Sequence, residues 1–219
     1  MRTAAILPIK SFAQAKQRLR YELAAHDRRA LVEAMFADAL VALGRVPSLE
    51  RIVVVSGDRV AQRIAAGYGA TIVEDDERGH NTAAARGIAT VQEDGIERAL
   101  LVPGDCPTLS ADDLNALLTH PAGERSALIV PDRHGTGTNA LLLTPPDVLA
   151  PSFGPDSRRR HLADASAVGL AAEIVELDSL GLDVDTPEDL DALRRTLAGT
   201  HGGAAHTRGM LSQLMRARA

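Results

Sequence analysis

Short apolar runs recur along the chain, and longer stretches with helical spacing of apolar positions separate them. Most of these runs are continuously apolar, as strands are when both faces of their sheet are covered. They predict strands at 4–8, 52–56, 71–73, 99–102, 128–130, 140–143 and 173–177. Helical spacing between them, for example over 28–43, 60–68 and 82–93, completes the βαβ pattern. The alternation predicts an α/β fold with a mostly parallel sheet flanked by helices.

Two later helices carry clear start signals. Ser110 stands before an acidic first turn, and Thr186 stands before Pro187 and two acidic residues. Serine and threonine are preferred N-caps, and proline suits the first helical position. Residues 199–219 differ from the rest, because they contain no acidic residue, begin with glycines and close on a short basic amphipathic segment. They predict a C-terminal tail, flexible or a short helix, after a single domain at 1–198.

Composition narrows the class of protein. The 219 residues are 45% hydrophobic and 24% charged, as in ordinary globular proteins. A net charge of −5 and an aromatic content of 2% argue against binding to nucleic acid polymers. A single cysteine excludes an internal disulfide, no apolar run approaches the ~20 residues of a membrane span, and the apolar start is too short for a signal peptide. We therefore expect a cytoplasmic protein that binds neither nucleic acid nor a membrane.

The first candidate site follows the first predicted strand. Lys10, Lys16 and Arg18 lie within nine positions of one another and could neutralise a nucleotide triphosphate. The segment lacks the glycines of the dinucleotide-binding and P-loop motifs. The alternative is a solvated basic helix start.

Carboxylates follow two other predicted strands. Asp105 comes directly after the strand at 99–102, and Gly104 before it would let a ligand approach the backbone. Asp183 and Asp185 alternate in an extended segment, so both carboxylates can converge on one cation, and oxygen ligands suit Mg²⁺. The alternatives are an ordinary turn at Asp105 and a helix-dipole role for Asp185.

Two further segments could bind small groups. Gly154 and Ser157 precede three arginines at a predicted helix start, which favours an anion, and the loop containing Thr138 and Asn139 could add hydroxyl or amide donors. An ordinary capped surface helix is the alternative. In a separate loop, Asn81 is flanked by small residues, Gly79 among them, so that its amide could read the edge of a base or ribose.

Three segments together carry a family resemblance: ILPIKSFAQAKQRL at 6–19, GDCP at 104–107 and DVDTPEDL at 183–190. In this order they resemble nucleotidyltransferases of the nucleotide-diphospho-sugar transferase (GT-A-like) fold, over about residues 1–197. The opening segment resembles that of the phosphoenolpyruvate or 2-phospho-L-lactate guanylyltransferases of coenzyme F-420 biosynthesis. The resemblance implies one α/β domain with a mostly parallel, mixed sheet.

The resemblance also implies a reaction, in which GMP passes from GTP to a phosphorylated three-carbon acid and pyrophosphate is released. Mg²⁺ would be the cofactor, and the product would pass to a deazaflavin-accepting transferase. It leaves open which acid is used and whether the protein is an oligomer. The residues implied are Lys10, Lys16, Arg18 and Asp105 for catalysis; Pro8, Lys10, Lys16, Gly79, Asn81 and Gly104 for the nucleotide; Thr138, Asn139, Gly154 and Ser157 for the acid; and Asp105, Asp183 and Asp185 for the metal.

Other functions remain open at this point. A molybdopterin or sugar-phosphate nucleotidyltransferase of the same fold would usually carry a glycine-rich first loop, which is missing here. A glycosyltransferase would use Asp183 and Asp185 as a DxD motif and would prefer UDP-sugars to GTP. A non-catalytic nucleotide-binding regulator would tolerate replacement of Asp105 by asparagine.

Overall fold

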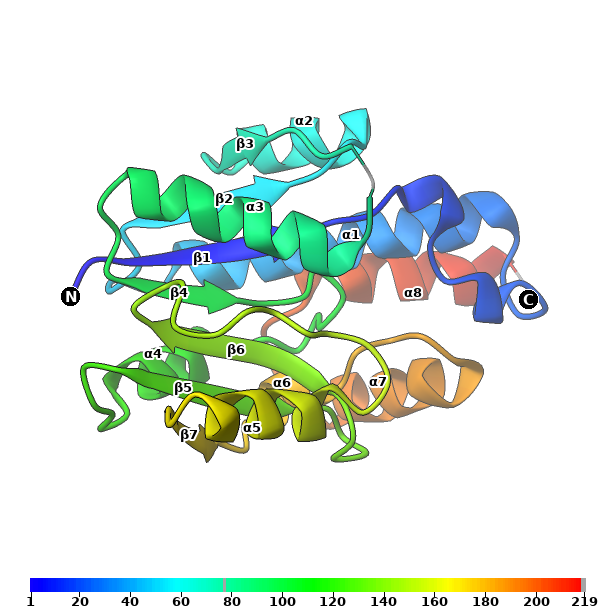
Figure 1. Cartoon of the computed structure of the whole chain (residues 1–219). Helices are drawn as coiled ribbons and strands as arrows, with labels where there is room; N and C mark the ends of the chain where they lie inside the picture. The colour runs from blue at the N-terminus through cyan, green and yellow to red at the C-terminus, as the bar shows by residue number, and fades with distance from the viewer. Residues whose placement is uncertain (77, 218–219) are drawn as a thin grey trace.

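The computed structural model describes residues 1–76 and 78–217, and these form an α/β fold around one sheet (Figure 1). Each predicted strand has a counterpart. The last one is displaced, because it was expected at 173–177 and lies at 171–174. The strands are β1 (Thr3–Pro8), β2 (Arg51–Val55), β3 (Thr71–Val73), β4 (Arg98–Leu101), β5 (Ser126–Pro131), β6 (Thr138–Thr144) and β7 (Ala171–Ile174).

The sheet has the order β3-β2-β1-β4-β6-β5-β7. β3, β2, β1 and β4 are parallel, β6 is antiparallel to both of its neighbours, and β7 is parallel to β5. The expected single-domain α/β fold with a mostly parallel, mixed sheet is therefore confirmed. β1 is buried throughout between β2 and β4, and so its end lies at the middle of the sheet.

Helices cover both faces of the sheet (Figure 1). One face packs against α1, α2, α4, α6, α7 and α8, and the other against α3 and α5, with alternate residues of each strand pointing to opposite sides. The helices are α1 (Ala25–Gly44), α2 (Arg59–Gly67), α3 (His80–Glu93), α4 (Ala111–Thr119), α5 (Ser157–Ala167), α6 (Asp178–Gly181), α7 (Pro187–Gly199) and α8 (Ala205–Ala217). Two 3₁₀ turns, Phe12–Gln14 and Gln17–Leu19, lie between β1 and α1.

Helix α3 approaches the sheet closely because it has a glycine where it crosses β1. A Cβ atom added to Gly87 would lie 2.4 Å from Ile6 Cγ2 and 3.0 Å from Val55 Cγ2. No larger side chain fits there unless the helix moves away from the sheet. The close contact fixes the first turn of α3 near the carboxyl ends of β1 and β2.

The two predicted helix caps are present. Ser110 Oγ accepts a hydrogen bond from Asp113 N at 3.4 Å, and Thr186 forms a reciprocal capping box with Asp189, with Pro187 at the first position. Each cap ends the preceding extended segment at a defined residue.

The C-terminal segment forms α8, which packs along α1 (Figure 1). Asp38 of α1 is buried and caps it, because the Asp38 carboxylate accepts hydrogen bonds from His206 N and Thr207 N at 3.1 and 2.8 Å. Leu211 and Leu214 of α8 are buried in the core. Among the described residues, no helix combines the length and apolar character that crossing a bilayer requires.

Candidate active site

A cavity of about 930 Å³ opens at the carboxyl ends of β1 and β4 and the start of β6. Almost all of the candidate residues line it: Pro8, Lys10, Lys16, Arg18, Gly79, Gly104, Asp105, Thr138, Asn139, Gly154, Ser157, Asp183 and Asp185. Asn81 is not among the residues that line it. Ligands of doubly wound sheets bind at this end of the strands, and the cavity is the candidate active site.

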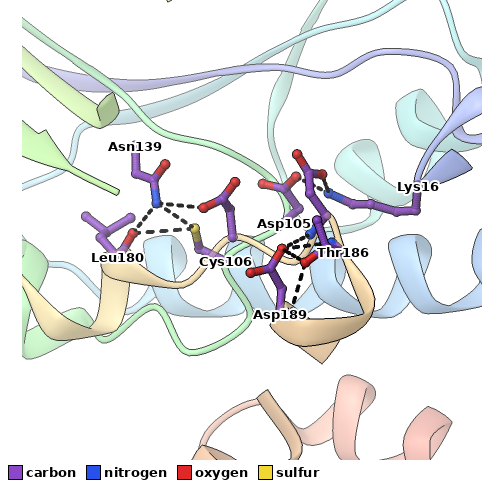
Figure 2. A network of polar contacts seen from close by, with 9 residues as sticks. Lys16, Asp105, Cys106, Asn139, Leu180, Thr186 and Asp189 are labelled. Carbon is purple, nitrogen blue, oxygen red and sulfur yellow. Dashed lines mark hydrogen bonds and ion pairs between the residues drawn. The ribbon is translucent and has the colours of Figure 1, made fainter. Parts of the chain in front are cut away.

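Lys16 lies at the centre of the charged groups (Figure 2). Its Nζ donates to Asp105 Oδ2 and, at 2.7 Å, to Asp185 Oδ1, and only 6% of its side chain is exposed. Burial opposes the charge of the ammonium, but the two carboxylates raise the pKa of Lys16 above its ordinary value. Lys16 was expected to hold phosphates. In this structure its ammonium lies between two of the carboxylates that were expected to bind the metal.

The backbone of Lys16 adopts the left-handed region, with a φ of 53°. This conformation is uncommon for a residue with a side chain and separates the two 3₁₀ turns. At the start of the same loop, Ile9 N donates to Val55 O of β2 at 2.9 Å. Asp58 also anchors the loop, because its Oδ2 accepts from Phe12 N at 2.9 Å while its Oδ1 caps α2 at Val60 N. The loop between β1 and α1 is thus tied to the sheet at its start and to the carboxylates at Lys16.

Asp185 is free to bind Lys16 because other groups cap α7. The Asp189 carboxylate accepts from Asp185 N at 3.0 Å and from Thr186 N at 2.8 Å (Figure 2). It also pairs with Arg133. The Asp185 side chain therefore does not cap the helix, and the helix-dipole alternative loses its main support.

Asp183 is partly buried beside the other two carboxylates. Burial and the negative charges of Asp105 and Asp185 raise its pKa to about 6. Asn139 Nδ2 opposes this shift by donating to Asp183 Oδ1 at 3.3 Å, and it also donates to the carbonyl of Leu180 at 2.6 Å (Figure 2). Asn139 was expected to bind substrate, but its amide nitrogen supports Asp183.

The carboxylates offer the hard oxygen ligands that Mg²⁺ prefers. After burial, the negative charges of Asp105 and Asp185 are the main causes that raise the pKa of Asp183, so that a cation among the three carboxylates would stabilise their charged forms. As they stand, no three acidic, histidine or cysteine side chains of the described residues are arranged to hold one metal ion. The donor set fits Mg²⁺ chemically, and the Lys16 ammonium supplies the positive charge in the present arrangement.

Gly104 lines the cavity but for a different reason from the one expected. A Cβ atom there would lie 2.5 Å from Ile9 Cδ1 and 3.0 Å from Phe36 Cδ2. The space beside Gly104 is filled by these two side chains and is not open to a ligand on that side. The glycine lets Ile9 pack against the core directly below the cavity.

Thr138, which lines the cavity, and His161 behind it form a buried pair. Thr138 Oγ1 lies 3.0 Å from His161 Nδ1, and the backbone N–H of Ser152 donates to His161 Nε2 at 3.0 Å. Burial, and to a smaller extent Arg160, lower the pKa of His161 to about 4, while Asp164 opposes the shift. His161 was not singled out from the sequence, although it lies four residues after Ser157 and so on the same face of α5.

Asn81 holds a loop segment instead of facing the cavity. Its Oδ1 accepts from Phe153 N at 2.8 Å, and its Nδ2 donates to Phe153 O at 3.1 Å. The Phe153 ring contacts His80 and His161 edge-on, each with ring centroids 5.3 Å apart. The side-chain amide of Asn81 is therefore already engaged, and from its segment Gly79 and His80 reach the cavity.

Cys106 follows Asp105 but is fully buried, and burial raises the pKa of its thiol well above the ordinary value. A nucleophilic cysteine requires a thiolate. Cys106 is therefore a packed residue of the core.

The low pKa of His161 predicts a pH dependence of stability. An unfolded histidine takes up a proton near pH 6.5, whereas the folded one does so only near pH 4. The contribution of His161 to the free energy of unfolding is therefore complete above pH 6.5 and declines as the pH falls towards 4. Urea unfolding at several pH values should show a steeper decline between pH 6.5 and 4 in the wild type than in His161→Asn. Equal slopes would contradict the assignment.

Comparison with known proteins decides the family. The model of the family described as guanylyl transferase CofC like matches residues 3–216. The chain belongs to this family. The expected guanylyltransferase activity is thereby supported, and the match extends through most of α8.

Curated relatives cover nearly the whole chain. A phosphoenolpyruvate guanylyltransferase of Conexibacter woesei is 54% identical over 99% of this chain and 98% of its own length. A 2-phospho-L-lactate guanylyltransferase of Methanothermobacter thermautotrophicus is 32% identical over 98% of this chain and 92% of its own length. A 3-phospho-D-glycerate guanylyltransferase of Phenylobacterium zucineum is 36% identical over 89% of this chain and 91% of its own length. The family thus includes proteins named for three different phosphorylated acids.

A solved structure supports the fold. A candidate nucleotide-diphospho-sugar transferase from Desulfovibrio desulfuricans superimposes with a TM-score of 0.76 over 99% of this chain and 98% of its own. At 17% identity, the likeness concerns the fold alone. It confirms the nucleotide-diphospho-sugar transferase-like architecture.

Proposed function

We propose that the protein transfers GMP from GTP to phosphoenolpyruvate at the cavity described above, with Mg²⁺ as cofactor. The observation that carries the proposal is the group formed by Lys16, Asp105 and Asp185 in a cavity that Thr138 also lines. Phosphoenolpyruvate is proposed as the acid because the relative with 54% identity is named for it. The product would then be passed to a deazaflavin-accepting transferase.

The reaction needs positioned charges more than a nucleophilic side chain. A phosphate oxygen of the acid attacks the α-phosphorus of GTP, the new P–O bond forms, and the bond to the β-phosphate oxygen breaks to release pyrophosphate. Lys10 and Arg18 are exposed at the cavity and are free to approach the leaving phosphates. Their positive charge would stabilise the negative charge that develops on pyrophosphate.

The carboxylates of Asp105, Asp183 and Asp185 would hold Mg²⁺, which neutralises phosphate charge and polarises the reacting phosphorus. Lys16 Nζ holds one oxygen of Asp105 and one of Asp185, so that a cation bound to both carboxylates would compete with the ammonium and would displace it from at least one of them. Its ammonium then becomes available in the cavity. In this proposal Lys16 exchanges a carboxylate partner for a phosphate partner when the nucleotide binds.

The test is a direct assay of the purified protein with GTP, Mg²⁺ and, in parallel, phosphoenolpyruvate, 2-phospho-L-lactate and 3-phospho-D-glycerate. We expect pyrophosphate release that is fastest with phosphoenolpyruvate, and a guanylated product of the corresponding mass. A deazaflavin-accepting enzyme is included to draw the reaction forward. Absence of pyrophosphate with every acid would refute the activity, and preference for another acid would refute the proposed acceptor.

A further inference from the structure

The side chains expected to bind the acid or the nucleotide differ in whether their hydrogen-bond donors are already used within the protein. The amide nitrogen of Asn139 donates to Leu180 and Asp183, and the amide of Asn81 is paired with Phe153. The Thr138 hydroxyl is bonded only to His161 among the described residues, and Thr138 lines the cavity although it is only 8% exposed. Of Thr138 and Asn139, the first two residues of β6, the threonine is the one that can donate to a substrate.

The hydrogen bonds of His161 determine where its proton lies. Nε2 accepts the backbone N–H of Ser152, and an amide N–H has no lone pair to accept in return. Nε2 must therefore be unprotonated, and a neutral imidazole then carries its hydrogen on Nδ1. The charged form would place two N–H groups face to face at Ser152, and burial disfavours it as well.

The proton on Nδ1 in turn orients Thr138. Since Nδ1–H donates to Thr138 Oγ1, the oxygen acts as acceptor in this bond, and its own hydrogen must point elsewhere. Within the described part of the chain that hydrogen has no other acceptor, and Thr138 is one of the residues that line the cavity. The hydroxyl is thus held as a donor towards the substrate.

We propose that His161 is a positioning residue, which through its Nδ1–H holds the Thr138 hydroxyl as a hydrogen-bond donor to an anionic oxygen of the acid substrate. The proposal rests on the proposed function for the identity of that substrate. His161 does not touch the acid itself. It acts through Thr138, and through Ser152 it also fixes the segment that leads to Gly154.

The first test uses the unmodified protein. In ¹⁵N NMR spectra of the imidazole groups, His161 should show a neutral ring protonated at Nδ1 at pH 7. A ring protonated at Nε2, or a charged ring, would overturn the inference. This measurement needs neither substrate nor a variant, and so its outcome does not depend on the assay.

The second test separates the two ring nitrogens. His161→Asn keeps an amide N–H near the position of Nδ1, whereas His161→Gln reaches the position of Nε2 and lacks a donor for Thr138. We expect His161→Gln to raise the KM for the acid about tenfold, as loss of a hydrogen bond to a charged group does, and His161→Asn to raise it less. The KM for GTP should stay within about twofold of the wild type in both. Equal effects of the two variants, or an equal rise in both KM values, would overturn the proposal.

The third test asks whether His161 acts through Thr138. Thr138→Val removes the hydroxyl and should raise the KM for the acid about as much as His161→Gln does, while Thr138→Ser should retain most of the affinity. In the Thr138→Val background, His161→Gln should add less than about twofold, because the group it positions is already gone. Independent, multiplicative effects would overturn the inference. A wild type inactive with every acid would refute the proposed function, whereas an active wild type with unaltered variants would refute this inference alone.

Discussion

Replacing Asp105 by asparagine is expected to lower kcat for guanylyl transfer by on the order of 10³-fold. The change removes one of the two carboxylates that bind Lys16 and one of the three that would hold Mg²⁺. Asparagine keeps the size and one oxygen, so packing at the end of β4 is retained. The measurement is the rate of pyrophosphate release at saturating GTP and acid.

A matched control has the same chemical change at an exposed site. Asp112 lies in the first turn of α4 and does not line the cavity, so that Asp112→Asn should keep kcat within about twofold. Thermal unfolding of both variants checks that the folds are intact. Turnover by a folded Asp105→Asn near the wild-type rate would contradict the catalytic role and favour a non-catalytic nucleotide-binding protein.

Replacing Gly87 by alanine is expected to destabilise the fold by about 1–3 kcal/mol. The new methyl group would lie 2.4 Å from Ile6 Cγ2, and α3 would have to move away from β1 to admit it. Because the first turn of α3 carries His80 and Asn81, the movement should also weaken the cavity wall. Urea unfolding measures the loss.

Gly209 is the matched control for this substitution. It lies inside α8, and an added Cβ would meet nothing within 4 Å. Alanine is favoured over glycine in a helix interior by about 0.5–1 kcal/mol, so that Gly209→Ala should stabilise the protein. The same change should therefore have opposite signs at the two positions. A stabilised Gly87→Ala would show that the contact with Ile6 does not constrain α3.

The strands could be predicted because most of them are buried on both faces and therefore appear as continuous apolar runs. β1 and β6 are buried throughout. The position of β7 was predicted wrongly because β7 is an edge strand that is mostly exposed and pairs only with β5. Its position depends on that pairing register, and Val175 packs against the core from outside the strand. A local pattern cannot distinguish such packing from membership of the strand.

Several candidate residues could be found from the sequence because they follow β1 or β4, or begin β6, at one end of the sheet. Their mutual bonds could not be predicted. Lys16 pairs with carboxylates 89 and 169 residues away, and the amide of Asn81 meets Phe153 72 residues away. His161 was missed because its role depends on two distances and on the direction of one backbone N–H. These contacts join residues that are far apart in the sequence, so that no single segment of the sequence could predict them.

The attachment of Phe153 on two sides has a consequence for how the cavity could change shape. Asn81 at the start of α3 holds its backbone, while His161 of α5 holds the neighbouring Ser152. The walls on this side are thus fastened to each other and would have to move as one unit. Another part of the wall is the loop between β1 and α1, in which Lys16 pairs with Asp105 and Asp185 and, under the proposed function, would exchange one of these partners for a phosphate. Under the proposed function we therefore expect the loop that carries Lys16 to adjust to substrates, and the side held by Asn81 and His161 to keep its shape.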